Sequence, residues 1–98
     1  MATEGLPTYQ MELRQTHRWQ KGTRYYICRL EQDLFGRWLV SSEWGGLRVG
    51  RRRLREEVYE SYELAIARLE QLNRKRQQRK YEQVLKHSGP YRVMGQNT

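Results

Sequence analysis

The sequence predicts an α+β domain, in which a twisted antiparallel sheet of about four strands packs against one long C-terminal helix. Two observations predict this class. Through residue 59, apolar side chains recur at every second position in short segments that are separated by turn residues. After Ser61 the spacing of apolar residues changes to that of a helix. Consecutive strands with short connections favour antiparallel pairing, and 98 residues leave room for one small domain.

The first two strands are predicted from alternation in residues 9–13 and 25–30. The apolar positions of the first segment are Tyr9, Met11 and Leu13, with polar residues between them. Residues 15–21 show no such alternation, and the Lys-Gly-Thr sequence at 21–23 is typical of a turn. In the second strand one face carries Tyr26, Cys28 and Leu30. We expect this face to point towards the core.

The third and fourth strands flank a glycine pair. A turn at residues 33–36 leads into the third strand, one face of which carries Trp38, Val40, Ser42 and Trp44. Gly45 and Gly46 permit a tight turn after it. Residues 51–59 are predicted to form the fourth strand, with Leu54, Glu56 and Val58 opposite Arg53, Arg55 and Glu57.

The long helix is predicted over residues 62–85. Ser61 is suited to cap its N-terminus, and the carboxylate of Glu63 in the first turn favours the helix dipole. Apolar residues then follow at helical spacing: Tyr62, Ala65, Ile66, Leu69 and Leu72, and later Tyr81, Val84 and Leu85. Residues 9–87 are expected to form the single domain, with a flexible lead-in at 1–8 and a flexible tail at 88–98.

Composition favours a polyanionic partner. The formal net charge is +8 and fifteen of the nineteen basic residues are arginine, which forms forked hydrogen bonds to phosphate and stacks on rings. Cys28 is the single cysteine, so an internal disulfide is excluded and a reducing compartment is indicated. No apolar run approaches the roughly 18 residues of a membrane span, and the N-terminus lacks a secretory pattern. A cytoplasmic chain without a membrane role is therefore expected.

Residues of the types that build catalytic sites are scattered. His17 and His87 lie far apart, and no His, Cys or Asp set has the spacing of metal ligands. Cys28 falls in the middle of an apolar strand, where it is expected to be an inert core residue. The sequence contains neither a glycine-rich phosphate loop nor a nucleophile elbow. We therefore expect no catalysis, no metal and no cofactor.

The strongest candidate binding surface is the hairpin around the glycine pair, with the residues Trp44, Arg48, Arg51, Arg53 and Arg55. In a strand, Arg51, Arg53 and Arg55 share one face about 7 Å apart, which approaches the phosphate spacing of an extended single strand, while Arg52 points the other way. The alternative is a solvated edge strand that charge protects from aggregation. Trp44 either stacks on a base or sugar or packs beneath the hairpin.

A second basic cluster occupies residues 73–80. If the helix continues, Lys75 and Arg79 share one side with Glu82, while Arg76 and Lys80 lie closer to the apolar stripe. This cluster is either a second nucleic-acid-binding patch or an ordinary solvated helix face. It would matter most if it merged with the hairpin arginines into one surface.

The ordered set of elements resembles the WGR domain, a family named for a Trp-Gly-Arg triplet and found in poly(ADP-ribose) polymerases and in small bacterial modules. The resemblance spans roughly residues 9–81 and is strongest for bacterial members, through the Leu-Phe-Gly turn. It is carried by Arg24-Tyr25-Tyr26, by residues 33–38, by Glu43-Trp44-Gly45, and by residues 60–65 and 75–81. It implies the same α+β fold.

Two positions depart from the family pattern. Gly46 stands in place of the arginine of the triplet, and Lys80 in place of a glycine that usually precedes the late tyrosine. In the polymerases, the tryptophan and arginine of this motif help to engage the end of a broken DNA strand, and the domain contacts neighbouring domains. The resemblance carries Trp44 into that role but not the arginine, for which Arg48 is a candidate substitute.

We therefore expect a non-catalytic accessory module that binds nucleic acid as a monomer, prefers DNA to RNA, and reads structure rather than base sequence. The candidate binding residues are Trp44, Arg48, Arg51, Arg53, Arg55, Lys75 and Arg79. The alternative is a protein–protein adaptor that docks an acidic partner or a neighbouring domain, with Leu47 and Val49 as candidate contacts. In a third interpretation the positive charge is incidental.

Overall fold

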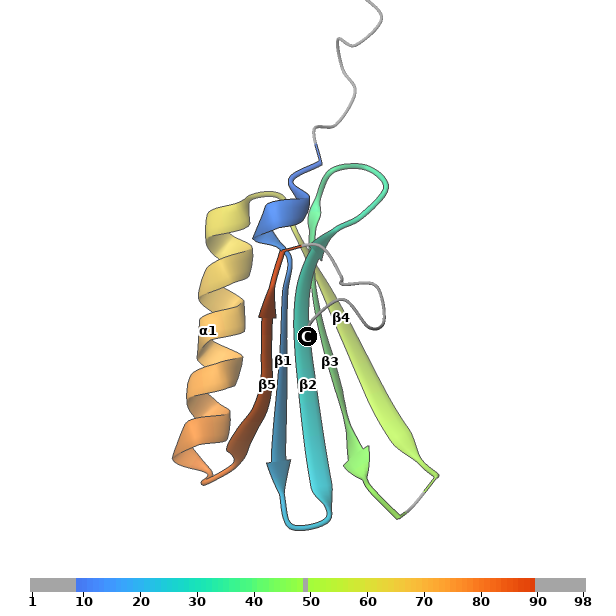
Figure 1. Cartoon of the computed structure of the whole chain (residues 1–98). Coiled ribbons are helices and arrows are strands. Elements are labelled where there is room, and N and C mark those ends of the chain that lie inside the picture. The colour runs from blue at the N-terminus through green and yellow to red at the C-terminus, as the bar shows by residue number, and fades with distance from the viewer. Residues whose placement is uncertain (1–8, 49, 90–98) are drawn as a thin grey trace, which may run out of the picture.

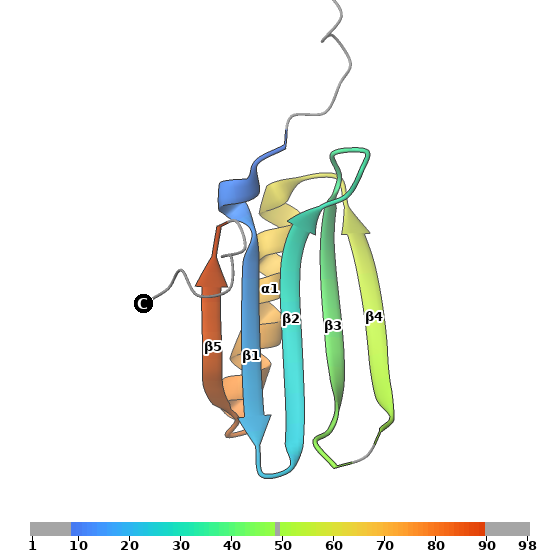
Figure 2. The ribbon, with the colours of Figure 1, turned by 45° about the vertical axis from the view of Figure 1, so that its right-hand side comes forward.

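The computed structural model describes residues 9–48 and 50–89, which form one five-stranded sheet and one helix. A short 3-10 helix, η1 (Met11–Leu13), comes first. The strands are β1 (Gln15–Lys21), β2 (Arg24–Gln32), β3 (Trp38–Gly46), β4 (Arg52–Tyr59) and β5 (Glu82–Ser88), and the helix is α1 (Tyr62–Gln78). All pairings are antiparallel, in the order β4-β3-β2-β1-β5. The helix runs along one face and connects the two edge strands (Figures 1 and 2).

The core lies between α1 and the sheet face that it covers, which we call the helix face. The strands contribute Trp19, Tyr26, Cys28, Leu30, Trp38 and Val40, and the helix contributes Ala65, Leu69 and Leu72. Cys28 and Leu30 have no exposed surface. The opposite face, which we call the open face, has no helix over it in the described chain. Because strand side chains alternate between the faces, neighbouring residues of one strand meet very different surroundings.

The predicted fold class is confirmed, but the sheet has one strand more than the expected four or so, and two elements differ from expectation. The predicted strand at residues 9–13 is wrong, because Met11–Leu13 is a 3-10 helix. The first strand is instead β1, in the segment without apolar alternation. In β1 only His17 and Trp19 are buried. Backbone pairing with β2 on one side and β5 on the other stabilises β1, although its side chains lack the apolar alternation that predicts a strand.

The predicted helix over 62–85 is too long, because α1 ends at Gln78 and residues 82–88 form β5. Lys80 has a left-handed backbone, with φ of 68°. The amide of Lys80 donates to the carbonyl of Gln77, and the amide of Tyr81 donates to that of Arg76, both at 3.0 Å. This pair of bonds is a Schellman motif, in which Lys80 occupies the position that favours glycine. The sequence did not indicate the end of α1 because lysine, and not glycine, occupies this position.

The shared helix side predicted for Lys75, Arg79 and Glu82 is consequently wrong, since Glu82 belongs to β5. Val84 and Leu85, which were expected on the apolar stripe, are about half exposed, at 52% and 46%. At the other end of α1 the prediction is confirmed: the Ser61 hydroxyl accepts a hydrogen bond from the amide of Leu64 at 3.2 Å. The expected lead-in at 1–8 and all but the first two residues of the expected tail at 88–98 lie outside the described residues.

Candidate nucleic-acid interface

Two clefts open on the helix side of the molecule, near the C-terminal end of α1. The first, which we call the turn cleft, measures about 600 Å³ and is lined by Tyr26, Trp44, Arg55, Arg76, Arg79 and Tyr81. Arg24 and Gly46 also line it. The second, the helix cleft, measures about 390 Å³ and is lined by Tyr26, Arg55, Arg68, Arg74, Lys75 and Arg76. Figure 1 shows the end of α1, the β1–β2 turn and the β3–β4 hairpin at the same end of the molecule.

The two clefts share Tyr26, Arg55 and Arg76. Arg55 comes from β4 and Arg76 from α1, so the basic hairpin and the basic part of the helix contribute to one continuous surface. The sequence alone left open whether these two patches merge. They merge because α1 crosses the sheet and delivers its last turn beside the β4 side chains that point to the helix face.

The charge of this surface has one sign. Seven cations line the two clefts: Arg24, Arg55, Arg68, Arg74, Lys75, Arg76 and Arg79. No Asp or Glu is among the described residues that line them. Arg68 is paired with Glu57 at 2.9 Å, but the other six make no ion pair within the described chain. Clefts lined by one sign of charge concentrate counter-ions of the other sign.

The end of α1 is the negative pole of the helix dipole, equivalent to about half a charge, and by itself disfavours an anion. Here the carbonyl of Arg79 accepts a hydrogen bond from Lys21 Nζ at 2.7 Å. That ammonium and the cations of the turn cleft outweigh the dipole. The local field is therefore positive despite the polarity of the helix end.

Trp44 combines both roles that the sequence left open. Its ring stacks on Tyr26, with centroids 5.8 Å apart and an interplanar angle of 14°. Trp44 is only partly buried, packs against the core, and still lines the turn cleft. The contact with Tyr26 holds the indole in place and leaves part of it accessible to a ligand.

The tight turn predicted at the glycine pair is wrong, because Gly45 and Gly46 are the last two residues of β3 and neither has a positive φ. At Gly45 the structure instead requires glycine because the backbone approaches closely. A Cβ at Gly45 would lie 2.7 Å from the carbonyl oxygen of Arg51, so a side chain there would displace the backbone of the hairpin. Gly46 is the register partner of Arg24 across β2 and β3, and both line the turn cleft. Arg24 is therefore paired across the sheet with the position where the triplet arginine is missing, while Arg48 does not line the turn cleft.

Four of the seven residues predicted for binding line the clefts: Trp44, Arg55, Lys75 and Arg79. The remaining three, Arg48, Arg51 and Arg53, are exposed and lie in or beside the hairpin without lining either cleft. Arg53 is the register partner of Trp44, and β4 is an edge strand of the sheet. As expected, Arg52 points away from the other strand arginines, to the open face, where it approaches Glu43.

Sequence reasoning missed Arg24, Arg76 and Tyr81 as parts of one surface. A signal for Arg76 was present, because it follows Leu69 and Leu72 on the apolar stripe, where a charge is unusual. Its guanidinium carbon lies 4.2 Å from the centroid of the Tyr26 ring and 5.0 Å from that of Tyr81. Arg24 and Tyr81 carried no comparable signal, because their contribution depends on strand register and on where α1 ends.

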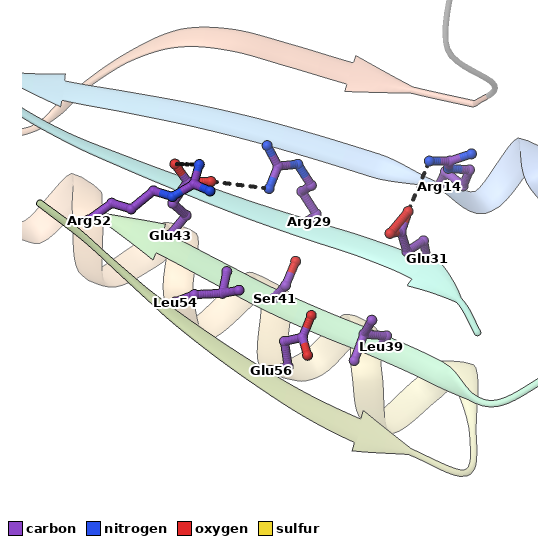
Figure 3. Close-up of a pocket in the computed structure, with 9 residues that line it drawn as sticks. All are labelled: Arg14, Arg29, Glu31, Leu39, Ser41, Glu43, Arg52, Leu54 and Glu56. Atoms are coloured by element: carbon purple, nitrogen blue, oxygen red, sulfur yellow. Dashed lines mark hydrogen bonds and ion pairs between the residues drawn. The ribbon is translucent and has the colours of Figure 1, made fainter. Parts of the chain in front are cut away.

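The open face differs in charge balance. A pocket there is lined by Arg14, Arg29 and Arg52 together with Glu31, Glu43 and Glu56 (Figure 3). Arg29 and Arg52 each approach Glu43 at 3.7 Å, and Arg14 pairs with Glu31 at 2.9 Å. Glu43 also accepts a hydrogen bond from the Tyr25 hydroxyl at 3.1 Å. The arginines of this pocket already have carboxylate partners.

Cys28 and His17 are buried on the helix face and held by neutral partners. Burial raises the pKa of the Cys28 thiol to about 12, and its Sγ donates to Asn73 Oδ1 at 3.1 Å. Trp19 Nε1 donates to the same oxygen at 2.8 Å. Among the described residues, no group of three or more His, Cys, Asp and Glu is arranged to hold a metal ion. No helix in residues 9–48 and 50–89 is long and apolar enough to cross a membrane.

Comparison with known proteins gives one finding. A family model described as the WGR domain matches residues 9–88, the whole length from η1 to the end of β5. Neither the curated proteins nor the solved structures that were compared include a match. The match covers all five strands, the helix and both clefts.

Proposed function

This chain belongs to the WGR domain family, and from that premise we propose that it is a non-catalytic accessory module that binds nucleic acid, DNA in preference to RNA. The observation that carries the proposal is the pair of adjoining clefts, lined by seven cations and by no carboxylate of the described chain. Neutralising backbone phosphates with such cations supplies affinity that does not depend on base sequence. The module would therefore select structure rather than sequence.

The aromatic residues support contact with more than phosphate. Trp44 lines the turn cleft beside Tyr81, and base–aromatic stacking contributes about 1–3 kcal/mol per base in single-strand binding. In this proposal Arg55, Lys75 and Arg79 neutralise phosphates within the clefts. Arg48, Arg51 and Arg53 extend the positive surface along the hairpin.

The test is fluorescence anisotropy of labelled single-stranded, blunt duplex and nicked oligonucleotides, titrated with the whole chain at two salt concentrations. The proposal expects binding that weakens with salt, with a slope of log K against log salt of about −0.7 to −0.9 for each phosphate contacted. It also expects one of the three structures to be preferred. Absence of binding to all three at micromolar protein in low salt would exclude the proposed function.

One observation favours the adaptor as a second candidate. Leu34 and Phe35, in the β2–β3 turn, are 84% and 75% exposed. The turn is held by the Asp33 carboxylate, which accepts hydrogen bonds from the amides of Phe35 and Arg37 at 2.9 Å. Leu47 is 47% exposed, and Val49 lies outside the described residues. An adaptor would lose its protein partner when Leu34 and Phe35 become serine and would bind no oligonucleotide even at low salt.

A further inference from the structure

We propose that Arg76 is the phosphate anchor for a single-stranded segment that runs through both clefts. This inference rests on the proposed function and adds to it the class of nucleic acid and the residue that holds it. Arg76 lines the turn cleft and the helix cleft alike, so a chain that occupies both must pass it.

Arg76 is held in a fixed orientation before any ligand arrives. It is half-buried on the stripe of α1 that packs on the sheet. Its guanidinium lies over Tyr26 of β2 and over Tyr81 just before β5, at 4.2 and 5.0 Å from the ring centroids. Stacking on two rings satisfies the faces of the guanidinium but not the N–H groups at its edge. Those N–H groups are the ones that bind an oxyanion.

The hydrogen bonding of Arg76 is incomplete. Its Nε is buried and has no hydrogen-bond partner. No carboxylate pairs with Arg76 among the described residues, whereas Arg68, two turns earlier on the same helix, pairs with Glu57. A buried donor without a partner is destabilising, and such groups are uncommon in folded proteins. Because Nε is buried, a ligand that supplies oxygen acceptors would reach Arg76 through the terminal N–H groups of the guanidinium.

The surrounding charges select a chain of phosphates over a single carboxylate. Arg55 stands beside Arg76 in both clefts, Arg24 and Arg79 lie in the turn cleft, and Arg74 and Lys75 lie in the helix cleft. Cations are thus distributed on both sides of Arg76 along the combined length of the clefts. A phosphodiester at Arg76 with further phosphates on each side matches this distribution, and guanidinium forks are suited to phosphate oxygens.

The size of the clefts favours a single strand. At about 390 and 600 Å³, each lies in the range of pockets for small molecules, about 300–1,000 Å³, and has room for a nucleotide. Trp44 in the turn cleft offers its ring to an unpaired base, whose faces are covered in a duplex. The ligand that fits both clefts is therefore an unpaired stretch of nucleic acid.

The experiment compares Arg76→Leu with Arg52→Leu, which removes the same charge from the open face. Each protein is titrated into labelled oligothymidylate and into the same strand annealed to its complement, at two salt concentrations. Arg76→Leu is expected to raise the Kd for the single strand at least tenfold and to flatten the salt slope by about 0.7, the value for one phosphate contact on a single strand. Arg52→Leu is expected to change the Kd less than twofold.

Each other outcome overturns the anchor, the single-strand ligand or the proposed function. If the wild-type chain binds the single strand but Arg76→Leu binds no more weakly than Arg52→Leu, Arg76 is a packing residue and the anchor is wrong, while the proposed function stands. If the wild-type chain prefers the duplex, the single-strand ligand is wrong. If it binds neither, the proposed function fails as well. Should the leucine variant not fold, Arg76→Gln replaces it, and an unchanged Kd with glutamine would also overturn the anchor.

Discussion

The two faces of the sheet use the same residue type in opposite ways. On the open face, the pocket contains three arginines and three glutamates, and Arg29 and Arg52 converge on Glu43. On the helix side, the clefts contain six arginines, one lysine and no carboxylate of the described chain. A phosphate at the open face would have to compete with carboxylates that are already in place. The contrast teaches that the faces differ in the pairing of their arginines as well as in their number, and pairing leaves the open-face arginines less available to an anion.

The largest effect is expected from removing cations on the helix side. Arg55→Gln/Arg79→Gln should weaken oligonucleotide binding about 100-fold, because each change removes an unpaired cation from the clefts. The matched variant Arg29→Gln/Arg52→Gln loses the same charge but should change the Kd less than threefold. Anisotropy titrations at one salt concentration measure both. Equal losses would mean that total charge, and not the clefts, governs binding.

The next effect concerns the partner of the open-face arginines. Glu43→Gln removes the charge shared by Arg29 and Arg52 and should lower the free energy of unfolding by about 1 kcal/mol, the upper end for partly exposed pairs. Urea denaturation measures this change. The variant should also gain weak oligonucleotide binding on the open face at low salt. A variant as stable as the wild-type chain would indicate that these pairs contribute nothing to folding.

A change of similar size but opposite sign in the free energy of unfolding is expected at Lys80, which has a left-handed backbone with φ of 68°. Lys80→Gly removes the penalty for a side chain in that conformation and should raise the free energy of unfolding by about 1 kcal/mol. Lys80 does not line either cleft, so oligonucleotide affinity should change little although one positive charge is lost. An affinity loss as large as that of Arg79→Gln would contradict the distinction between cations that line the clefts and cations that do not.

The smallest effect is a dependence of stability on pH through His17, which is buried on the helix face. Burial, and secondarily the charge of Lys86, lowers the pKa of His17 below 6.5. Its two ring nitrogens contact Gln15 Oε1 at 2.9 Å and Gln83 Nε2 at 2.8 Å, an arrangement that fits the neutral ring. The unfolded chain binds the proton more readily, so this contribution is complete above about pH 6.5 and is lost as the pH falls towards the lower folded pKa. Urea unfolding between pH 5 and pH 8 should show the decline, and His17→Gln should remove it.

Much of the fold followed from local patterns. Alternation located β2, β3 and β4, and the Ser61 cap located the start of α1. Both β1 and β5 escaped, together with the end of α1, for physical reasons. β1 is stabilised by backbone pairing on both sides rather than by an apolar face. The helix α1 ends where Lys80 adopts a left-handed backbone, a conformation that a lysine in the sequence does not predict.

The site was predictable in composition but not in assembly. Arginine runs indicated the hairpin and the helix, and the candidates chosen from them include Arg55, Lys75 and Arg79, which line the clefts. Their meeting in one surface depends on where α1 crosses the sheet, and the contribution of Arg24 depends on its register with Gly46. These are long-range relations that neighbouring residues do not encode.

The most direct test of the central claim is a map of amide, indole and guanidinium NMR signals of the whole chain, titrated with oligothymidylate. Binding through unpaired cations on the helix side should shift the signals of Trp44, Arg55, Arg76 and Tyr81. It should leave those of Arg29, Glu43 and Arg52 within the noise. Shifts centred on the open face, or spread evenly over both faces, would contradict the account.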